Sequence, residues 1–258
     1  MALLEVQNIR RRFGGLVALS EVSFAVEVGQ IVSVIGPNGA GKTTLFNVIT
    51  GMLRADEGSI RFRGEDVHGL APHQIAQRGM SRTFQTLSLF PRMTVLENVM
   101  AGRHCRTRAG VCAAALRLAW QRAEERAIRD SALACLDRVG LGSAADAPVS
   151  SLSFGQRRMV ELARALATEP GLLLLDEPAS GLNTHETDEL AALIGRIRDE
   201  GTTILLVEHD MSLVMEVSDH VLVLHYGTPI AAGPPAAIRN DPRVVSVYLG
   251  GDFADAAG

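Results

Sequence analysis

Two segments near the N-terminus alternate apolar and polar positions. They are residues 3–12 and 21–28, and the second places Val22, Phe24, Val26 and Val28 on one face. Alternation with a period of two is the pattern of a strand with one buried face. We therefore predict a pair of antiparallel strands at the start of the chain.

Later segments are short apolar runs without alternation: 31–35, 172–175, 203–207 and 221–224. Such runs are typical of strands buried on both faces of a parallel sheet. Helical segments are predicted at 43–50, 124–139 and 186–200, and after Ser153, where apolar positions recur at helical spacing. Strands that alternate with helices predict an α/β fold with a mostly parallel sheet.

The composition changes within the chain, because Ala, Leu, Arg and Glu dominate from about residue 91 to 138. We expect a single domain, 1–258, with a helical subdomain at 87–167 inserted in a catalytic core of 1–86 and 168–250. Residues 251–258 are small and polar and predict a frayed tail. Trp120 and the cysteines are expected to be packing residues.

Overall composition is that of an ordinary globular protein of 258 residues with a formal net charge of −4, which gives no reason to expect nucleic-acid binding. The apolar runs are far shorter than the roughly 18 residues of a membrane-spanning helix, and no signal peptide is predicted at the start. The cysteines, Cys105, Cys112 and Cys135, have no metal-type spacing. Their odd number favours free thiols and a cytosolic location.

One segment fits the phosphate-loop pattern in full: Gly36, Pro37, Asn38, Gly39, Ala40, Gly41, Lys42, Thr43 and Thr44. It follows a predicted buried strand and precedes a predicted helix, which is the context that phosphate binding requires. Lys42 is the only lysine among 25 basic residues, and a compact ammonium suits the β- and γ-phosphates of ATP. The Thr43 hydroxyl can bind Mg²⁺. A Gly-rich turn with an incidental lysine is the alternative. The sequence thus predicts a P-loop NTPase core with ATP and Mg²⁺ as its ligands.

Two carboxylates, Asp176 and Glu177, follow the apolar run at 172–175. Ligands of parallel sheets bind at the carboxyl ends of the strands. Asp176 is expected to hold Mg²⁺, and Glu177 to polarise the water that attacks the γ-phosphate. The alternative is that the two acidic residues cap a turn. It does not explain why they accompany a phosphate loop.

With a phosphate loop and these two carboxylates, the chain resembles the nucleotide-binding subunits of ABC transporters. Ser153, Gly155 and Gln156 match that family's signature motif, and Phe154 stands where the general form has glycine. The aromatic residue is similar to that of branched-chain amino-acid importers, as are residues 82–98, 181–183 and the C-terminal segments 227–233 and 238–250. Ser153 could also simply cap the following helix.

The resemblance implies roles for further residues. Phe13 would stack on adenine, Gln85 would reach Mg²⁺ and the attacking water, and His209 would contact the γ-phosphate. Each has an ordinary alternative: a core-facing aromatic, a solvated glutamine and a structural histidine. Asn183, within the Ser180–Asn183 loop expected at the dimer interface, stands where the family usually has aspartate.

The resemblance also implies partners and a location. Two ATP molecules would lie between two ATPase subunits, either two copies of this chain or this chain and a relative. Residues 86–108 would dock membrane-spanning permease subunits at the cytoplasmic face of the membrane, where the chain would be peripheral. A periplasmic or extracellular substrate-binding protein would act through the permeases.

Three other functions compete with this interpretation of the sequence. The segment 247–253 is also similar to ATPases of lipid or lipopolysaccharide exporters, which is the leading alternative. A soluble ATPase of ribosomes or DNA usually has two cassettes or a long coiled-coil insertion. A small P-loop kinase would leave the signature motif and His209 without a role. The sequence does not identify the transported molecule, and branched-chain amino acids are the leading expectation.

Overall fold

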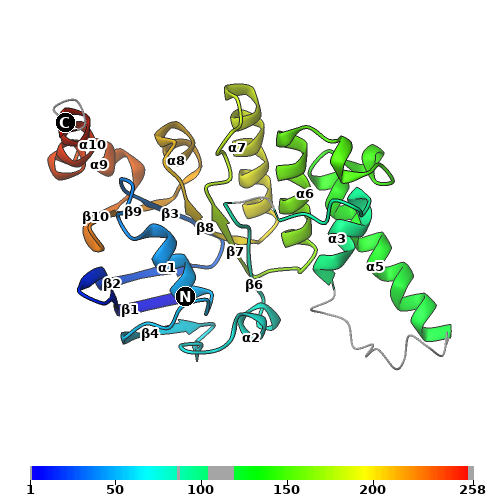
Figure 1. Ribbon diagram of the computed structural model, residues 1–258, viewed down its shortest axis with the longest axis horizontal. Coiled ribbons are helices and arrows are strands. Elements are labelled where there is room, and N and C mark those ends of the chain that lie inside the picture. The colour runs from blue at the N-terminus through cyan, green and yellow to red at the C-terminus, as the bar shows by residue number, and fades with distance from the viewer. Residues whose placement is uncertain (1, 86–87, 104–118, 255–258) are drawn as a thin grey trace.

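The computed structural model describes residues 2–85, 88–103 and 119–254 (Figure 1). Cys105 and Cys112 lie outside the described residues. So do part of the expected docking segment, 86–108, and the side chain of Trp120. Cys135 is buried among apolar side chains, so its prediction as a packing residue is confirmed.

The N-terminal strands belong to a four-stranded antiparallel sheet in the order β2-β1-β4-β5. The strands are β1 (Ala2–Phe13), β2 (Leu16–Glu27), β4 (Glu57–Phe62) and β5 (Glu65–Asp66). The predicted antiparallel pair is confirmed, although β2 begins five residues earlier than residue 21. The placement of Val28 on its buried face was wrong, because β2 ends at Glu27 and Val28 lies in the following turn, 64% exposed.

The larger sheet has six strands in the order β10-β9-β3-β8-β7-β6. They are β3 (Ile31–Ile35), β6 (Met80–Arg82), β7 (Leu172–Asp176), β8 (Thr203–Val207), β9 (His220–His225) and β10 (Thr228–Gly233). All neighbours pair in parallel except β10, which is antiparallel to β9. The mostly parallel sheet is therefore confirmed.

Helices cover this sheet and extend beyond its β6 edge (Figure 1). They are α1 (Lys42–Ile49), α2 (Pro72–Gln77), α3 (Val95–Arg103), α5 (Ala119–Arg138), α6 (Phe154–Leu166), α7 (Thr184–Asp199), α8 (Met211–Val217), α9 (Pro235–Arg239) and α10 (Pro242–Ala254). Residues 251–254 of the expected frayed tail are instead helical, because a helix that has formed elongates at little cost per residue, and residues 255–258 lie outside the described ranges. The subdomain boundaries, 87–167 in particular, stay a prediction.

Alternate residues of the parallel strands pack on opposite faces of the sheet. Leu172 and Leu174 belong to the core that contains α1 and the antiparallel sheet. Leu173 and Leu175 belong to the core that contains α3, α5, α6 and α7. The uninterrupted apolar runs are thus explained, because a strand between two cores has no solvated face.

Four parallel strands end at the same edge of the sheet, and predicted site residues lie within three residues of each end. Gly36 follows β3, Thr83 follows β6, Glu177 follows β7 and Glu208 follows β8. The carboxyl edge of an α/β sheet is the usual place for a ligand. Within the described ranges, no helix has the length and apolarity that crossing a membrane requires.

Candidate functional site

The phosphate loop occupies the turn between β3 and α1. Gly41 is the N-cap of α1 with φ of +101°, and a Cβ there would lie 2.6 Å from the Ala18 carbonyl oxygen. Any side chain would therefore strain the turn and push the loop from β2. The glycine lets the first turn of α1 open directly onto the loop, which is the arrangement that presents backbone N–H groups to a phosphate.

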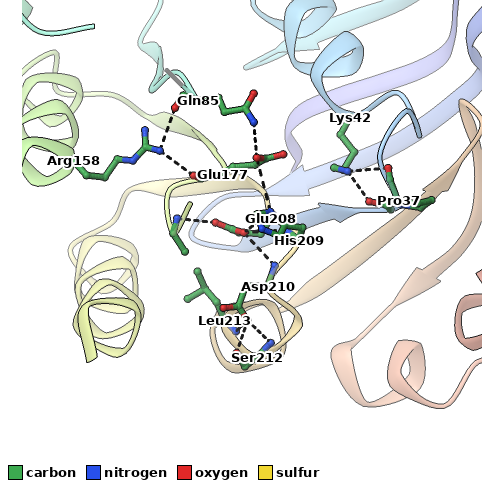
Figure 2. Close-up of polar contacts among 12 residues, drawn as sticks. Pro37, Lys42, Gln85, Arg158, Glu177, Glu208, His209, Asp210, Ser212 and Leu213 are labelled. Atoms are coloured by element: carbon green, nitrogen blue, oxygen red, sulfur yellow. Dashed lines mark hydrogen bonds and ion pairs between the residues drawn. The ribbon is translucent and has the colours of Figure 1, made fainter. Parts of the chain in front are cut away.

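The Lys42 side chain is buried against the inside of this loop. Its ammonium donates to the carbonyl oxygens of Gly36 at 2.6 Å and Pro37 at 3.1 Å (Figure 2). Burial lowers the pKa of Lys42, and the carboxylates of Glu177 and Asp176 oppose that shift. The chain's single lysine thus has a fixed direction and two acidic neighbours.

A cleft of about 490 Å³ opens over the loop. It is lined by Phe13, Leu16, Val17, Ala18, residues 38–44, Gln85, Glu177 and Tyr226. The structure therefore brings Phe13, Gln85 and Glu177 together with most of the phosphate loop. Phe13 is 44% exposed, so its alternative reading as a core residue is wrong.

Tyr226, which sequence reasoning missed, lies on the same cleft. It is 78% exposed, in the turn between β9 and β10. Leu16 and Val17 are also exposed there. Exposed apolar side chains grouped beside a phosphate loop suit the flat face of a base. A large aromatic before Gly227 was the only sequence signal for Tyr226.

Asp176 is held by a buried arginine. Its Oδ2 accepts from Arg82 Nη2 at 2.6 Å, and both side chains are almost fully buried. Arg82 also donates to Asn47 of α1 at 2.7 Å and to Thr50, the C-cap of that helix, at 3.2 Å. Arg82 therefore ties β7 to the helix after the phosphate loop, a contact that the sequence did not reveal.

Glu177 and Gln85 form a direct hydrogen bond across the sheet edge, with Gln85 Nε2 donating to Glu177 Oε2 at 2.7 Å. The Glu177 backbone has φ of +47°, which is uncommon for a residue other than glycine. Such a conformation persists only where surrounding contacts enforce it, and it gathers at functional sites. Here it turns the carboxylate toward Gln85 and the cleft.

His209 lies beside the same carboxylate. Its Nδ1 is 3.9 Å from Glu177 Oε2, and its side chain is 58% exposed. Glu208, which sequence reasoning also missed, is fully buried and accepts from the backbone N–H groups of Ala179 at 2.8 Å and His209 at 2.9 Å. Glu208 therefore holds the backbone at His209 and at Ala179, two residues after Glu177 (Figure 2). Its place directly after β8 was the available signal.

Two of the signature residues line a different cleft, of about 690 Å³, between α5, α6 and α7. Gly155 and Gln156 contribute to it, while Ser153 is the N-cap of α6. Ser153 Oγ accepts from Gln156 N at 3.2 Å, and Gln156 Oε1 accepts from Ser153 N at 3.0 Å. The alternative role of Ser153 as a helix cap is thus present in the structure. Helices α1 and α6 lie apart in the fold (Figure 1).

Phe154 and the loop before α7 are matched to each other. Gly181 has φ of +82°, and a Cβ there would lie 2.8 Å from the Phe154 ring, so any side chain would be strained and would displace the ring. Asn183 caps α7 and accepts from Glu186 N at 3.0 Å. Phe154 and Asn183 are the two residues that depart from the general family pattern, and they therefore lie on adjoining segments.

Oxygen donors suited to Mg²⁺ lie at or next to the cleft: Thr43 and Gln85 line it, and buried Asp176 directly precedes Glu177, which also lines it. Thr43 is exposed in the first turn of α1, and Arg82 holds one oxygen of Asp176. Among the described residues, no group of three His, Cys, Asp or Glu side chains could hold a metal alone. This donor set fits Mg²⁺, which typically binds through one or two carboxylates together with phosphate oxygens.

Comparison with known proteins gives consistent results. Residues 19–180 match the family described as "ABC transporter", and residues 228–254 match "Branched-chain amino acid ATP-binding cassette transporter". The chain is 45% identical to the high-affinity branched-chain amino acid transport ATP-binding protein BraF of Pseudomonas aeruginosa, over 96% of this chain and 98% of that protein. It is 46% identical, with the same coverage, to LivG of Escherichia coli, which has the same descriptive name.

Solved structures agree. The fold matches the ADP conformation of an ATP-binding cassette of an ABC transporter with a TM-score of 0.84 and 35% identity, over 97% of this chain and 99% of that one. A nucleotide-free cassette matches with a TM-score of 0.83 and 34% identity, over 96% and 99%.

Proposed function

The chain belongs to the ABC transporter family of ATP-binding, ATP-hydrolysing subunits, and from this premise we propose that it powers an importer of branched-chain or related amino acids. One observation carries the proposal. Similarity to the branched-chain proteins extends over 96% of the chain. The separate C-terminal match at 228–254 covers the whole segment 247–253, which could also suggest a lipid exporter. The importer is therefore favoured over that alternative.

The phosphate-loop cleft is proposed to bind ATP. Residues 36–44 would surround the phosphates, Lys42 would neutralise the β- and γ-phosphates, and Phe13 would stack on adenine. The support is geometric, because Phe13 and the loop line one cleft. A fixed ammonium inside a ring of backbone N–H groups is a strong site for a polyphosphate.

Mg²⁺ is proposed to bind at Thr43, Gln85 and Asp176. The metal would neutralise charge that develops on the phosphate oxygens. Arg82 holds Oδ2 of Asp176, which leaves Oδ1 for the metal or its water. Thr43 would contribute its hydroxyl from the first turn of α1.

Hydrolysis is proposed to depend on Glu177, with Gln85 and His209 beside it. Glu177 would take a proton from the attacking water as a general base. Gln85 hydrogen-bonds to the same carboxylate oxygen that His209 approaches. The three side chains therefore converge where a water on the γ-phosphate would lie, and His209 would contact the phosphate.

A second subunit is proposed to complete the site. Gly155 and Gln156 lie on a different cleft from the phosphate loop, and Ser153 caps the helix that carries them. They would contact the γ-phosphate of ATP bound to the partner, as the resemblance to the family implies. Two ATP molecules would then hold two ATPase subunits together, and hydrolysis would release them.

The other proposed partners are those that transport across a membrane requires. Membrane-spanning permeases would dock on the helical part of the chain, at the cytoplasmic face of the membrane, with the chain peripheral to the bilayer. A periplasmic or extracellular substrate-binding protein would deliver the amino acid to the permeases.

The test is an affinity purification of the Glu177→Gln chain with ATP from detergent-solubilised native membranes, with partners identified by mass. We expect two different multispanning permeases and a second, related ATPase. Recovery of lipid-export membrane proteins would support the exporter instead. Recovery of soluble or ribosomal partners alone would contradict a transport function.

A further inference from the structure

Helix α6 carries a buried arginine, Arg158, five residues after its N-cap, Ser153. Arg158 is only 3% exposed. Its Nη1 donates to Phe84 O at 3.0 Å and to Glu161 Oε2 at 3.2 Å. Its Nη2 donates to Gln85 O at 3.2 Å and to Glu177 O at 3.4 Å. One guanidinium thus joins three segments that are far apart in the sequence.

The backbone acceptors belong to the residues that form the candidate catalytic pair. Gln85 and Glu177 hydrogen-bond to each other through their side chains at 2.7 Å. Arg158 holds the main-chain carbonyl of both (Figure 2). Because the two carbonyls share one nitrogen, the separation of the two backbones is fixed by a single rigid group.

Glu161 balances the charge of this arginine one turn along α6. It is 2% exposed and also accepts from Phe84 N at 3.4 Å. Burial raises the pKa of Glu161, and the charge of Arg158 opposes that shift. A lysine could neutralise Glu161 as well, but it would lack the planar fork that reaches several acceptors at once.

We propose that Arg158 is a positioning residue for ATP hydrolysis, which sets Gln85 and Glu177 relative to each other from the helix that carries the signature residues. The inference rests on the proposed function, since it assigns Arg158 to the reaction proposed for Glu177. Any displacement of α6 moves the guanidinium and, with it, both carbonyls. Contact of the α6 N-terminus with a nucleotide on the partner subunit is thereby transmitted to the chain's own catalytic pair.

The experiment compares Arg158→Lys with Arg103→Lys in the full-length chain. Arg103 is a matched control, because it also donates to a backbone carbonyl, that of Ala167, and to a carboxylate, Glu169, at the other end of α6. Steady-state ATP hydrolysis gives kcat and KM, a fluorescent ATP analogue gives Kd, and thermal unfolding gives Tm. Gln85→Ala and the double variant Gln85→Ala/Arg158→Lys complete a mutant cycle.

We expect Arg158→Lys to lower kcat about 10- to 100-fold, the scale of a misplacement near 1 Å. Its Kd and Tm should stay close to those of Arg103→Lys, which should keep the kcat of the unmodified chain. The double variant should be within about twofold of Gln85→Ala alone, because Arg158 acts through the same pair.

Three outcomes would overturn the inference: an unchanged kcat, a fall in kcat matched by lost ATP binding or Tm, or strictly additive effects of Gln85→Ala and Arg158→Lys. Failure of the proposed function looks different. In that case the unmodified chain and Arg103→Lys would themselves bind or hydrolyse no ATP.

Discussion

Helices α1 and α6 both begin at a proposed phosphate-binding position, but their first turns are built differently. Gly41 is the N-cap of α1, and among the described residues no side chain caps that helix. Ser153 caps α6 in a reciprocal capping box with Gln156. The α1 terminus is shaped by backbone and left to a ligand, whereas α6 satisfies part of its own terminus with side chains.

This difference indicates how ATP binding and hydrolysis are divided between the α1 side and the α6 side. The α1 side is joined by Lys42, Phe13, Gln85 and Glu177 on one cleft, so one chain assembles nearly all of the chemistry. The α6 terminus lies on another cleft. Its capping box keeps the helix start ordered whether or not a phosphate is nearby. Substitutions at Glu177, Lys42 and Ser153 test the division, and one at Asp210 tests capping elsewhere, from the largest expected effect to the smallest.

Glu177→Gln tests whether the α1 side carries the reaction itself. We expect kcat to fall by about 10²- to 10⁴-fold, the usual contribution of a general base. ATP binding should remain, because the amide keeps the size of the side chain and the phosphate loop is untouched. Single-turnover hydrolysis and equilibrium binding of ATP measure the two quantities. Rapid hydrolysis by the variant would show that another group is the base.

Lys42→Ala tests whether the α1 terminus needs its cation to bind ATP. The lost charge-assisted hydrogen bonds should weaken binding about 10- to 100-fold. Equilibrium titration with Mg-ATP gives the Kd, and Lys42→Arg is the control that keeps the charge but not the compact shape.

The single lysine offers an independent check on the same site. Since Lys42 is the only lysine side chain, saturating Mg-ATP should protect the unmodified protein from amine-specific labelling everywhere except at the N-terminus. Labelling of Lys42 that is unaffected by Mg-ATP would contradict the proposed phosphate contact.

Ser153→Ala and Ser153→Asp separate capping from phosphate contact on the α6 side. Alanine should lower the free energy of unfolding by about 1 kcal/mol and slow turnover about tenfold through the lost hydrogen bond to a phosphate. Aspartate keeps the cap but places a negative charge there, so it should keep stability and still slow turnover. Denaturant unfolding and steady-state hydrolysis measure the two effects. Normal turnover by Ser153→Asp would place the phosphate elsewhere.

Asp210→Ala tests a side-chain cap outside the two proposed termini. Asp210 caps α8 and accepts from Ser212 N at 2.9 Å and Leu213 N at 3.3 Å. We expect a loss of about 1 kcal/mol in unfolding free energy near pH 7, measured by denaturant titration. An unchanged unfolding free energy would mean that the cap adds nothing.

The same cap should depend on pH. The hydrogen bonds from Ser212 lower the pKa of Asp210 below its ordinary value of 3.8. Its stabilisation is therefore fully present above pH 3.8 and is lost as the pH falls through the lowered pKa. The difference between the unmodified chain and Asp210→Ala should shrink only in that acid range. Asp210→Asn, which cannot ionise, should show no such shrinkage relative to alanine.

Much of the fold was predictable because its signals are local. The uninterrupted run at 172–175 predicted a strand buried on both faces, and its alternate leucines pack into two cores. Alternation failed only where it met a turn. Val28 continues the pattern of Val22 and Val26, but the chain turns at Gly29, where φ is +76°.

The candidate site was only partly predictable. Lys42, Asp176 and Glu177 were identified because motif spacing is a local property. Arg158 was not, although it lies four residues before Leu162 on the buried face of α6, with Glu161 beside it. A charged pair on an apolar helical face was the available signal, but its partners could not be read from the sequence.

The sequence by itself determined, to within one residue, where β3, β7, β8 and β9 end, because strand periodicity and loop motifs depend on neighbours along the chain. The short strand β6 was not predicted. Only the tertiary structure decided which of those ends meet. Gln85 faces Glu177, Arg82 holds Asp176, and Tyr226 joins Phe13 on one cleft. Each contact depends on strand order, and strand order is decided by the packing of residues far apart in the sequence.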